Sequence, residues 1–177
     1  MRPFLSLLLL LALVAAAETT VRFSPKGGCT AAIIAEINAA TNAIMMQAYN
    51  FTSPSIGDAL AAAARRGVQV VELQDNIASH QKNFQGPKLI AAGGAVFIDK
   101  AHKISHNKII LIDSQTILTG SFNFSENAEN SNAENLVILR HEPALAVSYV
   151  RNFSNHLTHC LPFKPAPPLA SPKAQNK

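Results

Sequence analysis

The chain has 177 residues, of which 48% are hydrophobic and only 15% are charged, and its formal net charge is +4. These values leave room for one well-packed domain with additional segments, and they exclude a dedicated, strongly basic nucleic-acid-binding protein. The mild positive charge is compatible with a polyanionic partner.

The N-terminal segment has the pattern of a secretory signal peptide. Arg2 is followed by an apolar stretch from Phe4 to Ala17, which ends in three alanines before Glu18. The stretch is short for a bilayer span, which takes about 20 residues. We therefore expect residues 1–17 to be a signal peptide and the mature protein to be periplasmic or secreted, with no stable membrane association after cleavage. The alternative is an uncleaved N-terminal anchor.

Export affects how the two cysteines, Cys29 and Cys160, are interpreted. In an oxidising compartment they could form a disulfide, although the sequence leaves open whether the two sulfur atoms meet. The cysteines and the scattered histidines do not match a recognised zinc-site spacing, and we expect no metal site.

Residues 161–177 contain many prolines and almost no aromatic residues. Such a segment buries too little apolar area to offset its ordering entropy, so we predict a flexible tail. The folded domain is then expected to span residues 18–160.

Within this domain, stretches with strand and helix periodicity alternate. Pro54 and Gly67 are typical of the start and the end of one helix. Alternation favours an α/β fold, a mixed and mainly parallel sheet with helices on both faces. The close spacing of three strands after residue 95 favours a local antiparallel element. Strands are predicted at 20–24, 43–51, 68–73, 95–99, 106–113, 116–120 and 134–140, and helices at 29–41, 53–66, 82–92 and 143–160.

The strand predicted at 106–113 reads HNKIILID and begins with two polar groups. Residues two apart in a strand share a face and lie about 7 Å apart, so His106 and Lys108 point the same way. An ammonium and an imidazole side by side can bind a phosphate and supply a nucleophile near neutral pH. The alternative is a solvated strand end. His80 and Lys82 have the same spacing without the apolar run, and we assign them no role.

Further polar residues follow at the ends of neighbouring predicted strands. Ser121 and Asn123 share a face just after Gly120, and Glu134 starts the next strand. Ligands usually bind at strand ends in open α/β sheets. The recurrence of these side chains at strand ends favours a single polar site over a solvated edge.

His106, Lys108 and Asp113 form an H-x-K-x4-D motif, and Gly120, Ser121 and Asn123 complete a G-S-x-N motif. Together they resemble the signature of the phospholipase D superfamily, in particular its small, single-motif exported bacterial endonucleases. The resemblance covers residues 20–158.

The resemblance implies a two-step cleavage of a phosphodiester. One histidine attacks phosphorus and a second protonates the leaving oxygen and then activates water. It assigns catalytic roles to His106, Lys108, Asp113 and Glu134 and substrate binding to Lys108, Ser121 and Asn123. Glu134 would orient an imidazole, and Asp113, of opposite parity to His106, would be the more structural member. The resemblance implies no metal and no other cofactor.

A mechanism with two histidines and a chain with one motif together imply a homodimer in which two copies of His106 share one site. The favoured function is a nonspecific endonuclease that contacts backbone phosphates of DNA, with RNA as a further substrate left open. Lys100, His102 and Lys103 are candidate contacts to flanking phosphates, or simply a solvated loop. The alternatives are a phospholipid hydrolase or transphosphatidylase, and a binding protein that kept the motif by descent.

Overall fold

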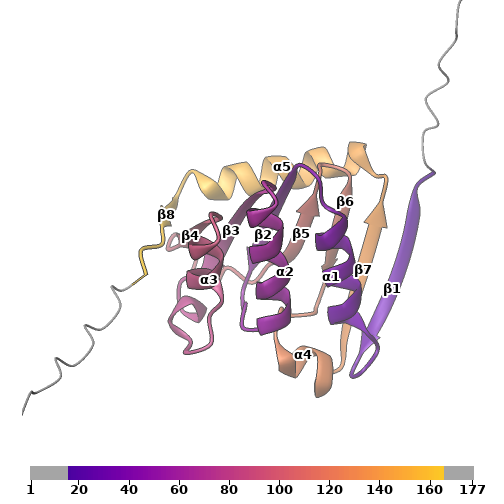
Figure 1. The fold of residues 1–177 in the computed structure, drawn as a ribbon, viewed down its shortest axis with the longest axis horizontal. Helices are drawn as coiled ribbons and strands as arrows, with labels where there is room; N and C mark the ends of the chain where they lie inside the picture. The colour runs from indigo at the N-terminus through magenta and orange to yellow at the C-terminus, as the bar shows by residue number, and fades with distance from the viewer. Residues whose placement is uncertain (1–15, 166–177) are drawn as a thin grey trace, which may run out of the picture.

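The computed structural model describes residues 16–165, which form one mixed β-sheet with helices on both faces (Figure 1). The strands lie in the order β1-β7-β6-β5-β2-β3-β4-β8. The strands are β1 (Glu18–Ser24), β2 (Ala43–Ala48), β3 (Gln69–Asp75), β4 (Ala95–Asp99), β5 (Lys108–Ile112), β6 (Thr116–Gly120), β7 (Glu134–Arg140) and β8 (Cys160–Pro162). The helices are α1 (Cys29–Ala39), α2 (Pro54–Arg65), α3 (Gly86–Ala91), α4 (Glu126–Asn130) and α5 (Pro143–Leu157), and a 3₁₀ turn, η1, covers Ala78–His80.

The predicted mixed α/β sheet is confirmed, but the prediction that it is mainly parallel is wrong. Only β2/β3 and β3/β4 pair in parallel, whereas the other five pairings among the described strands are antiparallel. Helices α2 and α3 provide the long crossovers that parallel neighbours need. By contrast, β5 and β6 are joined by a tight turn in which Asp113 and Ser114 have positive φ angles.

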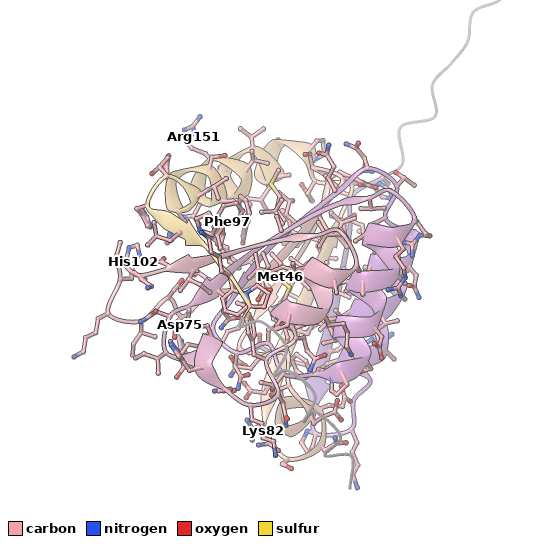
Figure 2. All side chains as sticks on the ribbon, turned by 60° about the vertical axis from the view of Figure 1, so that its left-hand side comes forward. Met46, Asp75, Lys82, Phe97, His102 and Arg151 are labelled. Carbon is pink, nitrogen blue, oxygen red and sulfur yellow. The ribbon has the colours of Figure 1, made fainter. Side chains whose placement is uncertain are left out.

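Both faces of the sheet are buried, which explains the low fraction of charged residues. Helices α1, α2 and α3 cover one face and α5 covers the other (Figure 1). Ile33 and Ile37 of α1 pack in the larger core with Ile44 and Met46 of β2. The smaller cores beneath α5 pair Phe153 with Leu73 of β3, and Ala146 with Leu111 and Ile117. Met46 lies in the interior, whereas Arg151 projects from the outer side of α5 (Figure 2).

The domain extends beyond the boundary predicted at residue 160. Strand β8 pairs with β4, and the backbone N–H of Phe163 donates to the carbonyl of Val96 at 2.8 Å. The Phe163 ring packs edge-on against Phe84, with 5.4 Å between centroids. Pro162 is tolerated because it lies on an edge strand. Residues 161–163 are thus part of the fold. Residues 1–15 of the predicted signal peptide (1–17) and residues 166–177 of the predicted tail lie outside the described residues.

The disulfide considered for Cys29 and Cys160 is not formed, since both are free and buried. Cys29 belongs to the core beneath α1 to α3, whereas Cys160 belongs to a core beneath α5. The two residues therefore lie on opposite faces of the sheet, and near its opposite edges (Figure 1). Disulfide geometry requires Cα atoms within about 7 Å.

Among residues 16–165 no helix is both long and apolar enough to cross a membrane.

Glu72 is a buried carboxyl group at the centre of the sheet. It pairs in the ladder with Met46 and Val96 and has no exposed surface. Neither carboxyl oxygen has a hydrogen-bond partner among the described residues. Burial raises the pKa of Glu72 well above its ordinary value of 4.5. The folded protein therefore keeps the proton at a pH where the unfolded chain releases it.

We predict that Glu72→Gln stabilises the protein relative to wild type as the pH rises. Below about pH 4.5 both states of the wild type are protonated, so Glu72 adds no pH dependence there. Above that pH only the unfolded wild type ionises, which lowers its free energy of unfolding by up to about 1.4 kcal/mol per pH unit until the folded pKa is reached. Urea unfolding from about pH 4.5 to about pH 8 measures the difference. Parallel stability curves for the two proteins would contradict the prediction.

Candidate active site

Apart from Asp113, the predicted site residues come together because the ends of five strands meet along one edge of the sheet, the edge that the strand ends form. Lys108, the first residue of β5, pairs with Ala48 at the end of β2. Gly120, the last residue of β6, pairs with Leu136 near the start of β7. The ends of β2 and β3 lie side by side because these strands are parallel. The antiparallel register therefore brings residues about 15 to 85 positions apart in the chain to the same edge.

Lys108 is the buried cation of this edge, with 7% of its surface exposed. Its Nζ donates to the carbonyl oxygen of His106 at 2.9 Å and lies 5.0 Å from the centre of the Tyr49 ring. Burial lowers the pKa of Lys108, while the nearby carboxylates of Glu134 and Asp75 oppose the shift. A partly desolvated ammonium of this kind interacts more strongly with a phosphate than a solvated one does.

His106 lies just before β5, and it is exposed. Its ring packs against Tyr49 with 4.6 Å between centroids and 53° between ring planes. No hydrogen bond from the described residues reaches either ring nitrogen of His106. The imidazole is thus supported on one side by an aromatic ring and is free to approach a phosphorus atom.

Ser121 and Asn123 follow β6, as predicted. The Oγ atom of Ser121 accepts from the backbone N–H and the side-chain amide of Asn135, at 3.0 and 3.3 Å. Its own hydroxyl hydrogen is therefore available to a ligand oxygen. The Oδ1 atom of Asn123 is buried and has no hydrogen-bond partner among residues 16–165. Gly120 has φ 140°, and a Cβ atom there would lie 2.3 Å from the carbonyl oxygen of Asn135, so this turn requires glycine.

Glu134 lies near Lys108 and makes no hydrogen bond to an imidazole among the described residues. Its Oε1 accepts from the side-chain amide of Asn132 at 3.0 Å, and its charge favours the protonated form of Lys108. Within residues 16–165 no hydrogen bond joins Glu134 to His106. The orienting role implied by the resemblance is therefore not carried out between these two residues of one chain.

Asp113 was grouped with the catalytic residues, but it lies at the opposite end of β5, about 16 Å from Lys108 along an extended strand. Its carboxylate accepts from the backbone N–H groups of Thr41, Asn42 and Ala43 and from the Thr41 hydroxyl, each at 2.9 Å. Although burial disfavours the charge, these bonds lower the pKa of Asp113. Asp113 therefore holds the start of β2 and is not part of the site.

We predict that Asp113→Asn lowers the free energy of unfolding by about 1–2 kcal/mol, because the amide replaces one charged acceptor. Asparagine tolerates the φ of 51° at this position. Stability from a carboxylate with a lowered pKa is present above its unfolded pKa and is lost as the pH falls through the folded one. Urea unfolding at neutral and acid pH should therefore show a deficit that shrinks with acid. A fall in kcat at neutral pH would contradict the structural role.

The sequence analysis missed three residues near the site. Tyr49 supports His106 and Lys108, as described above. The carboxylate of Asp75 accepts from the backbone N–H groups of Ile77, Ala78 and Ser105 at 2.8–3.0 Å, which anchors the loop that leads to His106. Lys82, which was assigned no role, lines a polar cleft. The contacts of Tyr49 with His106 and Lys108, and of Asp75 with Ser105, join residues about 30 or more positions apart, and no local pattern indicates them.

The cleft has a volume of about 400 Å³ and adjoins the site, since Asn50 follows Tyr49 and Ser125 is two residues beyond Asn123. The backbones of Phe51 and Phe124 join these two segments through an isolated parallel β-bridge. The lining residues are all polar and include one cation: Asn50, Thr52, Gln81, Lys82, Asn83, Ser125, Glu126 and Asn127. Lys82 projects from the surface at the lower end of the molecule (Figure 2).

Comparison with known proteins identifies the family. Residues 33–157 match the family model described as cardiolipin synthase, PLD-like domain. The chain is 42% identical over 133 residues to a Rickettsia conorii protein named phospholipase D, covering 75% of this chain and 66% of that protein. It is 31% identical over 117 residues to the mitochondrial cardiolipin hydrolase of Chlamydomonas reinhardtii, covering 66% of this chain and 52% of that protein.

Among solved structures, the phospholipase D family member Nuc from Salmonella typhimurium superposes with a TM-score of 0.81 at 31% sequence identity. The match covers 85% of this chain and 100% of Nuc. NucT from Helicobacter pylori shares the fold, with a TM-score of 0.77 at 22% identity. The family model spans most of the chain and Nuc is matched along its full length; the chain therefore belongs to the phospholipase D superfamily of enzymes, in its small single-domain branch.

Proposed function

We propose that this enzyme is a phosphodiesterase that acts as a nonspecific endonuclease on DNA through a phosphohistidine intermediate. A ring nitrogen of His106 attacks phosphorus and forms an N–P bond while the P–O bond to the leaving group breaks. A second imidazole gives its proton to the leaving oxygen, then takes a proton from the water that hydrolyses the N–P bond. Lys108, Ser121 and Asn123 supply the groups that bind the phosphoryl oxygens as charge develops.

The observation that supports a nucleic-acid substrate is the polar cleft beside the site. A nucleic acid needs polar and cationic contacts for the phosphates that flank the scissile bond. The cleft offers amide and hydroxyl groups, the Lys82 ammonium and the Glu126 carboxylate, and it has no apolar lining residue. Acyl chains of a phospholipid would instead require a largely apolar groove. The cleft therefore favours a nucleic acid over a lipid.

A phospholipid hydrolase or transphosphatidylase is the second candidate, supported by the 42% identity to the Rickettsia protein named phospholipase D. The chain corresponds to 66% of that protein's length. The deciding experiment incubates purified protein with plasmid DNA, RNA, phosphatidylcholine and cardiolipin in parallel. Nicking of the plasmid with no release of lipid headgroups supports the endonuclease. Headgroup release at a higher kcat/KM than DNA cleavage would overturn it.

The second imidazole is proposed to come from a second copy of the chain. All six histidines lie among the described residues, and His106 pairs only with Tyr49 in aromatic contacts. The Nδ1 atom of His80 lies within hydrogen-bonding distance of the carbonyl oxygen of Asn76, at 2.8 Å. His141 follows β7, at the opposite end of that strand from Glu134. The remaining three contact one another and Asp99. A homodimer with one shared site supplies the missing group.

Export to the periplasm or the medium is proposed from the sequence of residues 1–17. Cell fractionation and N-terminal sequencing of the purified protein test it. A chain that begins near Glu18 and is found outside the cytoplasm supports the proposal. An intact N-terminus in the membrane fraction would contradict both cleavage and the absence of stable membrane association.

We predict that DNA cleavage persists in millimolar EDTA. The groups assigned to the phosphoryl oxygens are an ammonium, a hydroxyl and an amide, so no step of the proposed reaction uses a metal ion. The measurement is the initial rate of plasmid nicking with and without EDTA, at a temperature well below the unfolding midpoint. Complete loss of cleavage that magnesium restores would contradict the assignment of these side chains.

A further inference from the structure

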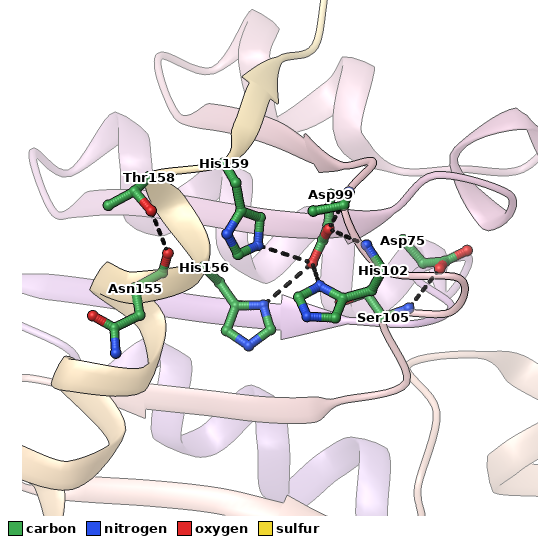
Figure 3. A network of polar contacts seen from close by, with 9 residues as sticks. Asp75, Asp99, His102, Ser105, Asn155, His156, Thr158 and His159 are labelled. Atoms are coloured by element: carbon green, nitrogen blue, oxygen red, sulfur yellow. Dashed lines mark hydrogen bonds and ion pairs between the residues drawn. The ribbon is translucent and has the colours of Figure 1, made fainter.

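Outside the phosphodiesterase site, four titratable side chains converge at the edge of the sheet near β8 (Figure 3). Asp99 is the last residue of β4, His102 lies in the loop that follows, His156 is in the last turn of α5, and His159 precedes β8. One ligand atom from each lies within 4.8 Å of the ligand atoms of the others. Two distant segments of the chain, 99–102 and 156–159, therefore bring one carboxylate and three imidazoles together.

The Asp99 carboxylate is buried and is held in a fixed orientation. Its Oδ1 accepts from the backbone N–H groups of Ala101 and His102, at 3.0 and 3.2 Å. This leaves Oδ2 to face the imidazoles, with Nδ1 of His102 at 2.9 Å, Nδ1 of His156 at 3.2 Å and Nε2 of His159 at 3.7 Å. Burial disfavours the charge, but bonds from His102, His156 and the backbone outweigh it and hold the Asp99 pKa below its usual range.

The three nitrogen–oxygen distances are compatible with three edges of a tetrahedral coordination sphere, and all the ligand atoms lie within 4.8 Å of one another. Zinc bonds of about 2.0–2.1 Å to nitrogen and oxygen place neighbouring ligand atoms about 3.3–3.4 Å apart. The three nitrogen–oxygen distances, 2.9, 3.2 and 3.7 Å, lie around that value. The donor set also suits zinc, which binds imidazole nitrogen and carboxylate oxygen readily.

The side chains of the cluster do not satisfy all of one another's hydrogen-bonding groups. The Nε2 atom of His159 is buried and has no hydrogen-bond partner among the described residues. The three imidazole rings lie only 4.9–5.3 Å apart between centroids. One divalent cation bound at their centre would supply the partner that Nε2 of His159 lacks.

We propose that Asp99, His102, His156 and His159 form a structural Zn²⁺ site. Four ligands from the protein are typical of a closed, non-catalytic site. The ion would tie the α5–β8 corner to the end of β4 and would anchor, through His102, the loop that leads to His106. Asp99 shares its face of β4 with Phe97, which packs beneath α5, whereas Lys108 shares its face of β5 with Ile110 beneath α1 to α3. The zinc site and the phosphodiesterase site are therefore distinct.

This proposal replaces the expectation that the chain has no metal site. That expectation rested on the spacing of the two cysteines and the histidines together, but the cysteines are not among these ligands. The actual signal is two pairs of residues with two positions between the members, Asp99 with His102 and His156 with His159. Each pair alone is uninformative, and only the fold brings them together across a separation of more than 50 residues.

The test uses the full chain without an affinity tag, stripped with a chelator and titrated with Zn²⁺ alone. Elemental analysis is expected to give one zinc per chain, and cobalt substitution should give the visible absorption of a tetrahedral site. Zinc at about 100 times its dissociation constant should raise the unfolding midpoint by about 5–10 °C.

The main variant is His102→Ala, because the His102 side chain is 47% exposed and its loss leaves the core intact. This variant and His156→Ala should each weaken zinc binding by about 100-fold or more and abolish the midpoint shift. The matched controls are His80→Ala and His141→Asn, exposed histidines outside the cluster that should leave zinc affinity unchanged. Circular dichroism without zinc establishes that each variant is folded.

Two results would overturn the proposal. One is a wild-type chain that takes up no zinc, and the other is a His102→Ala and a His156→Ala variant that both bind zinc as wild type does. His106→Asn separates this site from the proposed function, because that variant should bind zinc normally whatever its activity on DNA or lipid. Loss of zinc binding in His106→Asn would place the ion at the phosphodiesterase site instead and would contradict the structural role.

Discussion

His106→Asn is expected to lower the rate of phosphodiester cleavage by about 10⁴-fold or more, because asparagine cannot form the covalent phosphoryl intermediate. The same change should alter the free energy of unfolding by no more than about 0.5 kcal/mol. His106 is exposed, precedes β5 and loses only its contact with the Tyr49 ring. The measurements are kcat/KM on plasmid DNA and the urea unfolding curve of the same preparation.

The chain offers a matched control in His80, which also precedes a lysine by two residues, Lys82. His80→Asn makes the same chemical change at a surface position outside the site and should leave kcat unchanged. A phosphoryl adduct should be trapped on the wild type and on His80→Asn but not on His106→Asn. Retention of more than about one per cent of wild-type activity by His106→Asn would remove this residue from the role of nucleophile.

The second large effect is expected when wild-type and His106→Asn subunits are mixed under conditions that allow exchange. If two copies of His106 share one site, every mixed dimer lacks either the nucleophile or the general acid. With a roughly ninefold excess of the variant, about one tenth of the wild-type chains remain in wild-type dimers, and activity per wild-type chain should fall to that level. Light scattering on the pure protein should give about twice the mass of one chain.

One shared site is expected because four other described histidines have contacts that hold them away from His106. His102, His156 and His159 surround Asp99, and the ring of His80 is bonded to a backbone carbonyl. A second imidazole for the leaving group is therefore not supplied near His106 by the described part of the chain. Mixing with His80→Asn instead of His106→Asn controls for exchange itself and should leave activity unchanged. Full activity of a monomer at nanomolar concentration would contradict the shared site.

Much of the fold could be predicted because its elements have clear local patterns. The helix predicted at 29–41 is α1, and Pro54 begins α2 as its position indicated. The strands with strong apolar runs were also predicted, including β5 and β7. The predictions of the fold are wrong where strand pairing, and not the local sequence pattern, determines the structure. Residues 161–163 have a tail-like composition, yet β4 has a free edge that accepts them as a strand. Likewise, close spacing indicated the antiparallel pairing of β5 with β6, but no local feature showed the other four antiparallel pairings among the described strands.

The candidate site could be predicted only in part, for the same reason. Strand parity and spacing indicated His106, Lys108, Ser121, Asn123 and Glu134, and the structure brings these residues to one edge of the sheet. Asp113 belongs to the same motif but lies at the far end of β5, where it binds the start of β2. Tyr49 directly follows β2 and Asp75 ends β3, and their contacts with residues 105–108 depend on the register of the sheet.

The sequence by itself determined most of the side chains that are candidates for the chemistry. Periodicity decides which neighbours share a face, and this is a local property of the backbone. Only the tertiary structure decided which distant segments meet. It set the charge environment of Lys108 and gathered Asp99, His102, His156 and His159, because these contacts depend on strand order and on the packing of α5 against the sheet. Packing of buried surfaces stabilises such contacts only after the whole sheet has formed, so no short stretch of sequence encodes them.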